Sequence, residues 1–258
     1  MKLRIGYGLF LLAVTFNGMS APADPSRDIL YQASTINALL AGYYDGILSC
    51  GELTRQGDIG LGTFDGLDGE MIVLDRIVYQ VTSDGAVQTV SSALMVPFAN
   101  VTFFDPDETF AMHNINSLDQ LQKELDRHLI NRNVFYAIRI DGTFPAVKVR
   151  SVAKQSKPYP KLADAVKNQS VFELSNVKGT LVGFWCPEFI QALNVPGFHL
   201  HFLADDRRRG GHVLDCRLAE GKVSLDPTAA FTIQLPEKGF GQLDPGGNHS
   251  EELNAVER

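Results

Sequence analysis

An alternating segment that begins at Phe198 and reads Phe-His-Leu-His-Phe-Leu constrains the fold more than any other part of the chain. This period of two predicts a β-strand, because successive side chains of a strand point to opposite faces of its sheet. Phe198, Leu200 and Phe202 would then pack on one face. His199 and His201 would project from the other face, roughly 6–7 Å apart along the strand.

A third histidine follows this strand at a distance that suits a β-hairpin. The intervening residues 205–211, Asp-Asp-Arg-Arg-Arg-Gly-Gly, are rich in turn formers, and His212 opens another strand-like run. A hairpin can bring His212 opposite His201. Three imidazoles from two paired strands suit a borderline transition metal such as zinc, and they leave ligand positions for water or substrate. The pattern therefore predicts a catalytic metal site in the C-terminal half.

Other interpretations of these residues stay open at the level of sequence. The three histidines could be surface or hydrogen-bonded side chains without a metal. Cys216 follows His212 at even spacing and could be a fourth, soft ligand, although a buried small apolar residue is the favoured interpretation. The chain has 3 cysteines, which permits one disulfide or none. The remaining histidines are expected to be structural or solvent-facing, namely His113, His128 and His249.

The N-terminus has the features of a secretory signal peptide. Lys2 and Arg4 provide positive charge, a short apolar stretch follows, and small residues allow cleavage after Ala21 or Ala23. We therefore expect residues 1–23 to be removed and the mature protein to be exported to the periplasm or the medium. Without Lys2 and Arg4 the formal net charge changes from -7 to about -9. Such a charge disfavours nucleic acid and anionic membranes as partners.

The length of 258 residues allows one large domain or two small ones. Strand-like segments outnumber helical ones, which predicts an α+β fold of mainly antiparallel or mixed β-sheets in two packed subdomains with a few helices. Pro158 and Pro160 favour a boundary between an N-terminal α+β subdomain (residues 24–155) and a C-terminal β-rich metal-binding subdomain (residues 156–258). The predicted helices cover residues 34–48, 117–129 and 162–168, and Ser117 with Gln120 makes a capping-box pattern at the start of the second. The predicted strands cover residues 71–82, 87–90, 101–104, 135–140, 146–152, 171–174, 180–185, 198–203, 212–218, 223–225 and 231–235. Asp141-Gly142 is expected to end the strand at residues 135–140.

A glycine-rich stretch at residues 57–70 superficially suggests a nucleotide-binding loop. It precedes a strand and lacks the dinucleotide and P-loop spacings, so we reject that interpretation. Instead Gly-Leu-Gly-Thr-Phe at residues 60–64 and Leu-Asp-Gly-Glu-Met at residues 67–71 closely resemble the signature of the bacterial α-acetolactate decarboxylases. The resemblance continues through the histidine hairpin and the strand that ends at Arg150, and it covers nearly the whole mature chain. Asp65 is a small departure, because family members often carry asparagine there.

The resemblance implies a zinc-dependent decarboxylation of 2-acetolactate to (R)-acetoin and CO2 by a homodimer, with no pyridoxal or thiamine cofactor. The metal ligands that it implies are His199, His201, His212, Glu70 and Glu257. It also implies catalytic roles for Arg150, Glu70 and Glu257, and substrate contacts for Thr63 and Arg150. The polar tail at residues 237–258, otherwise a loose end, would then fold back onto the site. Glu251 and Glu252 are rivals of Glu257 for the place near the metal.

Without the resemblance, the same residues support blander interpretations. Glu70 would be a strand-edge carboxylate and Arg150 a surface cation. Carbonic anhydrases, cupin oxygenases and zinc hydrolases can show a similar arrangement of histidines, so the motif alone does not fix the reaction. The alternatives are therefore a cupin-like metal oxygenase or zinc hydrolase with the same three histidines, or an exported metal-binding protein without turnover.

Overall fold

The computed structural model describes residues 28–242 and 249–257, so the predicted signal segment lies outside the described residues. Its larger sheet has seven strands in the order β14-β1-β8-β3-β4-β5-β6. Neighbours in this sheet are antiparallel except for β1 and β14, which are parallel. The strands are β1 (Ile29–Ala33), β3 (Ile59–Thr63), β4 (Glu70–Leu74), β5 (Ile77–Val81), β6 (Val87–Thr89), β8 (Phe98–Thr102) and β14 (Ala230–Gln234). Two further short strands, β2 (Leu48–Ser49) and β7 (Met95–Val96), pair with each other as a separate antiparallel sheet.

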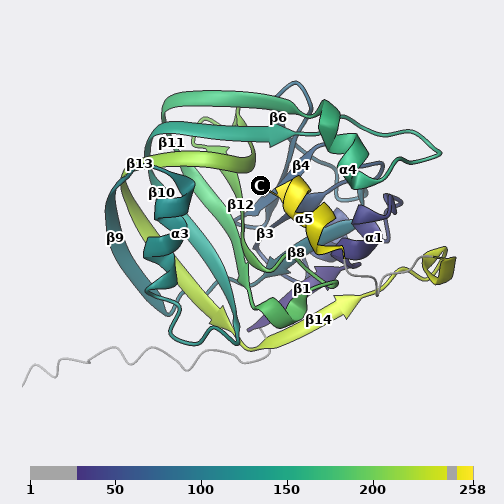
Figure 1. Cartoon of the computed structure of the whole chain (residues 1–258), viewed down its shortest axis with the longest axis horizontal. Coiled ribbons are helices and arrows are strands. Elements are labelled where there is room, and N and C mark those ends of the chain that lie inside the picture. The colour runs from purple at the N-terminus through teal and green to yellow at the C-terminus, as the bar shows by residue number, and fades with distance from the viewer. Residues whose placement is uncertain (1–27, 243–248, 258) are drawn as a thin grey trace, which may run out of the picture.

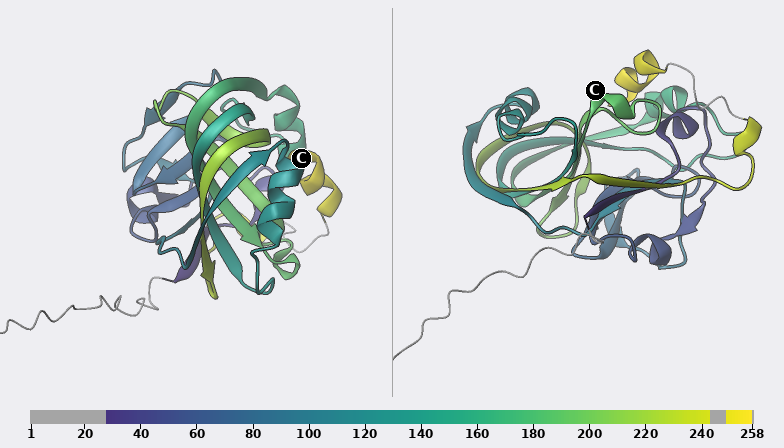
Figure 2. Two further views of the ribbon diagram at one scale, coloured as in Figure 1. Left: turned by 90° about the vertical axis from the view of Figure 1, so that its left-hand side faces the viewer. Right: turned by 90° about the horizontal axis from the view of Figure 1, so that it is seen from below.

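The second sheet is antiparallel and has five strands in the order β10-β11-β12-β13-β9, with an additional pairing of β10 and β13. That additional pairing closes β10, β11, β12 and β13 into a ring. The turned views in Figure 2 show these long strands, teal to yellow-green, curving beside the shorter purple and blue strands of the first sheet. The strands are β9 (Glu108–Ile115), β10 (Phe135–Ser151), β11 (Ser170–Cys186), β12 (Gly197–Ala204) and β13 (Gly210–Thr228).

A row of glycines lets the long strands run without interruption. Gly142 pairs with Gly179 on one side and with Gly221 on the other. A Cβ atom on Gly142 would lie 2.7 Å from the carbonyl oxygen of Glu220, so a side chain does not fit there. Residues 135–152, 171–185 and 212–225 were each predicted as two strands, and these predictions are wrong. β10, β11 and β13 each run without a break through the glycine between the two predicted segments.

A turn was missed in the first sheet. The predicted strand at residues 71–82 is a hairpin of β4 and β5, and its turn residues Asp75 and Arg76 have φ angles of 52° and 67°. Such positive φ values at both central residues are typical of a two-residue hairpin turn, which usually contains asparagine or glycine. β4 begins at Glu70, which lies opposite Val81 of β5 in this hairpin.

Helices are few and short, as predicted, and they are α1 (Ile36–Leu40), α2 (Cys50–Leu53), α3 (Leu118–Asp126), α4 (Leu162–Ala165) and α5 (Ser250–Glu257), with 3-10 turns at Val166–Asn168, Glu188–Ile190 and Phe240–Gln242. The predicted helix at residues 34–48 is shorter than expected, because Gly42 has a φ of 88° and the helix has ended by then. Ser117 caps α3 as predicted and accepts a hydrogen bond from the backbone of Gln120. The Gln120 side chain, however, accepts from Asn116 N rather than from the cap residue.

The expected division at residue 155 does not coincide with the two sheets. β9 and β10 precede that point and pair within the second sheet, whereas β14 follows it and joins the first. The helices α1, α4 and α5 gather beside the sheets, with the C-terminal helix α5 against α4 (Figure 1). Among the described residues no helix has the length and apolarity needed to cross a membrane.

Candidate active site

The histidine hairpin forms as the sequence predicts. His201 of β12 lies directly opposite His212 of β13 in the strand register. Leu200 and Phe202 are buried in the hydrophobic core inside the second sheet, and Phe198 packs against that core. The alternation of the strand therefore places the apolar side chains in the core and the imidazoles on the other face.

The three imidazoles converge. The ring centroids lie 5.2 Å apart for His199 and His201, 5.0 Å for His199 and His212, and 5.3 Å for His201 and His212. Ligand nitrogens from all three lie within 4.8 Å of one another. This arrangement confirms the predicted grouping of the histidines.

One of the imidazoles is oriented by a backbone carbonyl from the other sheet. His201 Nδ1 lies 2.8 Å from the carbonyl oxygen of Met71 in β4, so a proton on Nδ1 is donated there. His201 Nε2 then carries a lone pair, and this buried atom has no hydrogen-bond partner among the described residues. Histidines that bind a metal through one ring nitrogen are commonly oriented by a hydrogen bond of this kind from the other ring nitrogen. Met71 could not be found from the sequence, because any residue has a backbone carbonyl.

Burial keeps these histidines neutral. It lowers the pKa of His199 to about 3, with a smaller contribution from the positive charge of Arg150. The pKa of His201 is also held well below its usual value, chiefly by burial and then by His199. Neutral imidazoles are the form that binds a metal ion.

Arg150 and Glu70 join the histidines from two different sheets. Arg150 lies near the end of β10, directly opposite His212 in β13, and only 4% of its surface is exposed. Its Nη1 atom lies 3.3 Å from Glu70 Oε1, and Glu70 Oε2 lies 3.6 Å from His201 Nε2. Both residues are buried, so the strand-edge and surface interpretations are wrong. Charged groups that are buried together in a pocket mark a candidate functional site.

The C-terminal helix closes this group of residues. Arg150 Nη2 donates a 3.1 Å hydrogen bond to the carbonyl oxygen of Val256, whose side chain is buried. Glu257 follows as the last residue of α5, and its side chain lies outside the described part of the structure. Of the two other glutamates considered for this place, Glu251 is exposed, and Glu252 forms ion pairs with His249 and Lys161.

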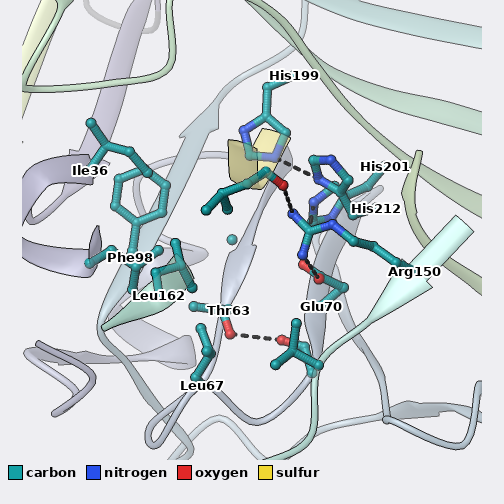
Figure 3. A pocket seen from close by; sticks show the side chains of 15 residues that line it. Ile36, Thr63, Leu67, Glu70, Phe98, Arg150, Leu162, His199, His201 and His212 are labelled. Atoms are coloured by element: carbon teal, nitrogen blue, oxygen red, sulfur yellow. Dashed lines mark hydrogen bonds and ion pairs between the residues drawn. The ribbon is translucent and has the colours of Figure 1, made fainter. Parts of the chain in front are cut away.

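These residues line a pocket of about 440 Å³, which includes some open solvent. Thr63 is in its lining as predicted, and its hydroxyl donates a 2.7 Å hydrogen bond to the carbonyl oxygen of Gly69. Figure 3 shows Arg150, Glu70, His201 and His212 on one side of the pocket and mainly apolar residues on the other, with Thr63 beside Leu67. The apolar wall, which sequence reasoning missed, includes Ile36, Leu39, Leu67, Phe98, Val152, Leu162 and Val256.

The donor set fits a metal ion. Two nitrogens bound to one tetrahedral zinc ion at about 2.0–2.1 Å lie about 3.3 Å apart. His199 Nε2 and His212 Nδ1 are 3.2 Å apart, which matches that separation. The buried Nε2 of His201, left without a hydrogen bond from the described residues, is explained if it is a third ligand. Three imidazole nitrogens beside a carboxylate and a guanidinium can hold a Lewis acid next to an anionic substrate.

The other histidines and the cysteines stand apart from this group. His113 is exposed, His128 stacks on Phe110 beside Glu108, and His249 contacts Glu252. Cys216 is buried in the core of the second sheet, which confirms the favoured interpretation over a fourth ligand. Cys50, Cys186 and Cys216 are all buried free thiols.

Comparisons with known proteins agree with the geometry. A family model described as alpha-acetolactate decarboxylase matches residues 30–243. The chain is 50% identical over 237 residues to an alpha-acetolactate decarboxylase of Methanosarcina mazei, covering 92% of this chain and 82% of that protein. It is 42% identical over 249 residues to that of Brevibacillus brevis, covering 91% and 87%. The crystal structure of the Bacillus subtilis strain 168 protein has a TM-score of 0.86 at 38% identity, covering 89% of this chain and 99% of that one.

Proposed function

The chain belongs to the alpha-acetolactate decarboxylase family, and from that premise we propose that it uses a zinc ion to convert 2-acetolactate to (R)-acetoin and CO2. The enzyme is a carboxy-lyase. One observation carries the proposal: three imidazoles, Glu70 and Arg150 meet in a single pocket. That set combines a metal site with charged groups for an anionic substrate.

The residues that would hold the ion are His199, His201 and His212, with Glu70 and Glu257 as further oxygen ligands. When bound, the ion supplies a Lewis acid for the hydroxyl and ketone oxygens of the substrate. Histidine nitrogens with carboxylate oxygens are a ligand set that zinc accepts readily. No role is left for a separate electron-sink cofactor, because the substrate's own ketone accepts the electron pair of the broken bond.

Arg150 binds the negative charge of the substrate. Its guanidinium is held at two points, by Glu70 and by the carbonyl of Val256, while its buried Nε has no hydrogen-bond partner in the described part of the chain. A guanidinium that is held in place and has a further N–H donor can form a charge-assisted hydrogen bond to the substrate carboxylate. It also stabilises the negative charge that develops on oxygen as CO2 leaves. Arg150 thus positions the scissile carbon–carbon bond.

The carbon that loses CO2 must then gain a proton on one face. Glu70 and Glu257 are the proposed proton donors. Glu70 contacts both Arg150 and His201, so its carboxyl group lies on the polar side of the pocket. The opposite wall of the pocket is mainly apolar, and the hydroxyl of Thr63 beside it donates its hydrogen bond to the carbonyl oxygen of Gly69. Protonation from the polar side alone would give one enantiomer of acetoin.

A colorimetric acetoin assay tests the function. Purified protein is given 2-acetolactate before chelation, after chelation and after zinc is restored, with metal content measured at each stage. We expect acetoin to form, to stop after chelation and to return with zinc. The variant His201→Ala should lose metal and activity, whereas His113→Ala, at an exposed position, should keep both. Protein with a full complement of metal that releases no acetoin would overturn the proposal. Oxygen consumption would instead favour the alternative of a cupin-like metal oxygenase.

Export and dimerisation are further proposals. Lys2, Arg4 and the apolar stretch after them support removal of residues 1–23. N-terminal sequencing of protein recovered outside the cytoplasm should find a start at residue 22 or 24, and an intact Met1 would contradict export. Light scattering after size-exclusion chromatography should give twice the mass of the mature chain if it is a homodimer, and a monomer mass would contradict that.

A further inference from the structure

The pocket has two walls of opposite character, and this division orients the substrate. Arg150, Glu70 and the imidazoles form one wall, and a set of buried apolar side chains forms the other (Figure 3). Each polar group of a bound molecule is stabilised only if it faces the first wall, because burying an unpaired polar group is unfavourable. The bound molecule is taken to be 2-acetolactate, so the inference rests on the proposed function.

The stereochemistry of the substrate then fixes the direction of one alkyl group. C2 of 2-acetolactate is tetrahedral and carries a hydroxyl, a carboxylate, the acetyl group and a methyl group. With the hydroxyl, the carboxylate and the ketone oxygen on the polar wall, the fourth substituent points away from that wall. The acetyl methyl, by contrast, lies in the plane of the ketone and runs along the wall. The apolar wall therefore faces the alkyl group at C2.

Leu162 is one of the residues of this wall that lie outside the two sheets, together with Ile36, Leu39, Leu67, Val152 and Val256. Phe98 lies within β8, paired with Thr63 of β3 in the larger sheet. Leu162 instead opens α4, a helix of 4 residues whose N-cap Lys161 makes no side-chain capping bond to the described helix. It is only 3% exposed and packs in one cluster with Ile36 and Leu253, beneath α5. Its side chain lines the pocket on the side opposite Arg150 and Glu70 (Figure 3).

We propose that Leu162 is a specificity-determining residue that limits the length of the alkyl group at C2 of the substrate. A methyl group is accommodated, and each further methylene approaches the isobutyl side chain of Leu162. Discrimination by one methylene in an apolar pocket is typically about 10–200-fold in kcat/KM. Shortening Leu162 should relax this discrimination for longer substituents, because the space that it fills becomes available to substrate.

The test measures kcat/KM for three 2-hydroxy-3-oxobutanoates whose C2 substituent is methyl, ethyl or propyl. For the wild-type enzyme we expect the value to fall about tenfold or more from methyl to propyl. In Leu162→Ala the ratio of propyl to methyl should rise about tenfold or more. Leu162→Val is the second variant should the alanine protein fail to fold, with a smaller rise in the same direction. Leu162→Met, which conserves volume, should keep the wild-type ratio.

Leu40→Ala is the matched control. Leu40 belongs to the same hydrophobic cluster and is 2% exposed, but it does not line the pocket. Its truncation should lower stability to a similar degree and leave the substrate ratio unchanged. A ratio that stays at the wild-type value in folded Leu162→Ala or Leu162→Val, or that shifts equally in Leu40→Ala, overturns the inference. A wild-type enzyme that makes no acetoin at all defeats the proposed function instead, so the two failures are distinguishable.

Discussion

Arg150 Nη2 donates a 3.1 Å hydrogen bond to the backbone carbonyl of Val256, a residue 106 positions further along the chain. This bond joins the end of β10 to the C-terminal helix. The same guanidinium contacts Glu70 in the other sheet. Three segments that are distant in sequence therefore set the position of one positive charge in the pocket.

Replacing Arg150 with lysine should lower kcat strongly. Lysine keeps a positive charge but has no planar fork, so it cannot hold Glu70 and the Val256 carbonyl while also binding the substrate. We expect a loss of about 10²–10³-fold, the range found when one stabilising donor is removed. Steady-state acetoin kinetics measure it. The control Arg139→Lys changes an arginine that pairs with Asp75 and Asp141 outside the pocket, and an equal loss there would contradict a specific role.

Docking of α5 should matter more for activity than for folding. Leu253 is 7% exposed and packs in the cluster with Ile36 and Leu162. Leu253→Ala removes apolar contacts of a helix that belongs to neither sheet. We expect kcat/KM to fall about tenfold, because each 1.4 kcal/mol of lost positioning corresponds to one factor of ten. Glu251→Ala, on the exposed side of the same helix, should be unaffected. Normal kinetics in Leu253→Ala would show that the helix position is irrelevant.

Removing the metal should lower thermal stability as well as activity. An ion that binds only the folded chain stabilises it by about 2.7 kcal/mol at a free concentration one hundred times its Kd. Scanning calorimetry with and without chelator should therefore show a lower melting temperature for the metal-free protein. The difference should vanish in His201→Ala, which lacks one ligand. An unchanged melting temperature after verified metal removal would contradict a site built into the fold.

Asp226 should make the protein less stable as the pH rises. Burial raises the pKa of this carboxyl to about 7, and the neighbouring Asp28, Asp107 and Asp105 add to the shift. Between about pH 4 and pH 7 the unfolded chain releases this proton and the folded chain keeps it, so unfolding becomes easier as the pH rises. Above pH 7 the penalty is complete and constant.

The variant Asp226→Asn tests that effect. Asparagine can still accept the hydrogen bond that Asp105 N donates, but it carries no charge. Its free energy of unfolding should exceed that of the wild type by about 1–3 kcal/mol at pH 8, with the gap closing toward pH 4. Urea unfolding at several pH values measures the gap. A gap that is the same at pH 4 and pH 8 would refute the assignment.

The sequence was most informative where the pattern was local. The alternation around His199 and His201, with a turn before His212, predicts that this segment is a strand, which face carries the histidines, and that the strand pairs with the one at His212. The structure confirms all three predictions. Turn residues were less reliable. Asp141-Gly142 marks a close approach of three strands rather than a turn, whereas Asp75-Arg76 forms a turn without the usual asparagine or glycine.

Contacts between distant segments could not be derived from periodicity. Nothing local in the sequence says that Arg150 lies near Glu70, or that a backbone carbonyl in β4 orients His201. Arg150 and Glu70 were predicted only through the family resemblance. The apolar wall was missed because Ile36, Phe98 and Leu162 look like ordinary core residues in their own segments.

The most direct measurement is anomalous diffraction at the zinc absorption edge from crystals grown with zinc. We predict one strong peak between the rings of His199, His201 and His212, at about 2.0–2.1 Å from one nitrogen of each. Rings that point apart, or a zinc peak elsewhere with none between them, would contradict a zinc site built from these three histidines.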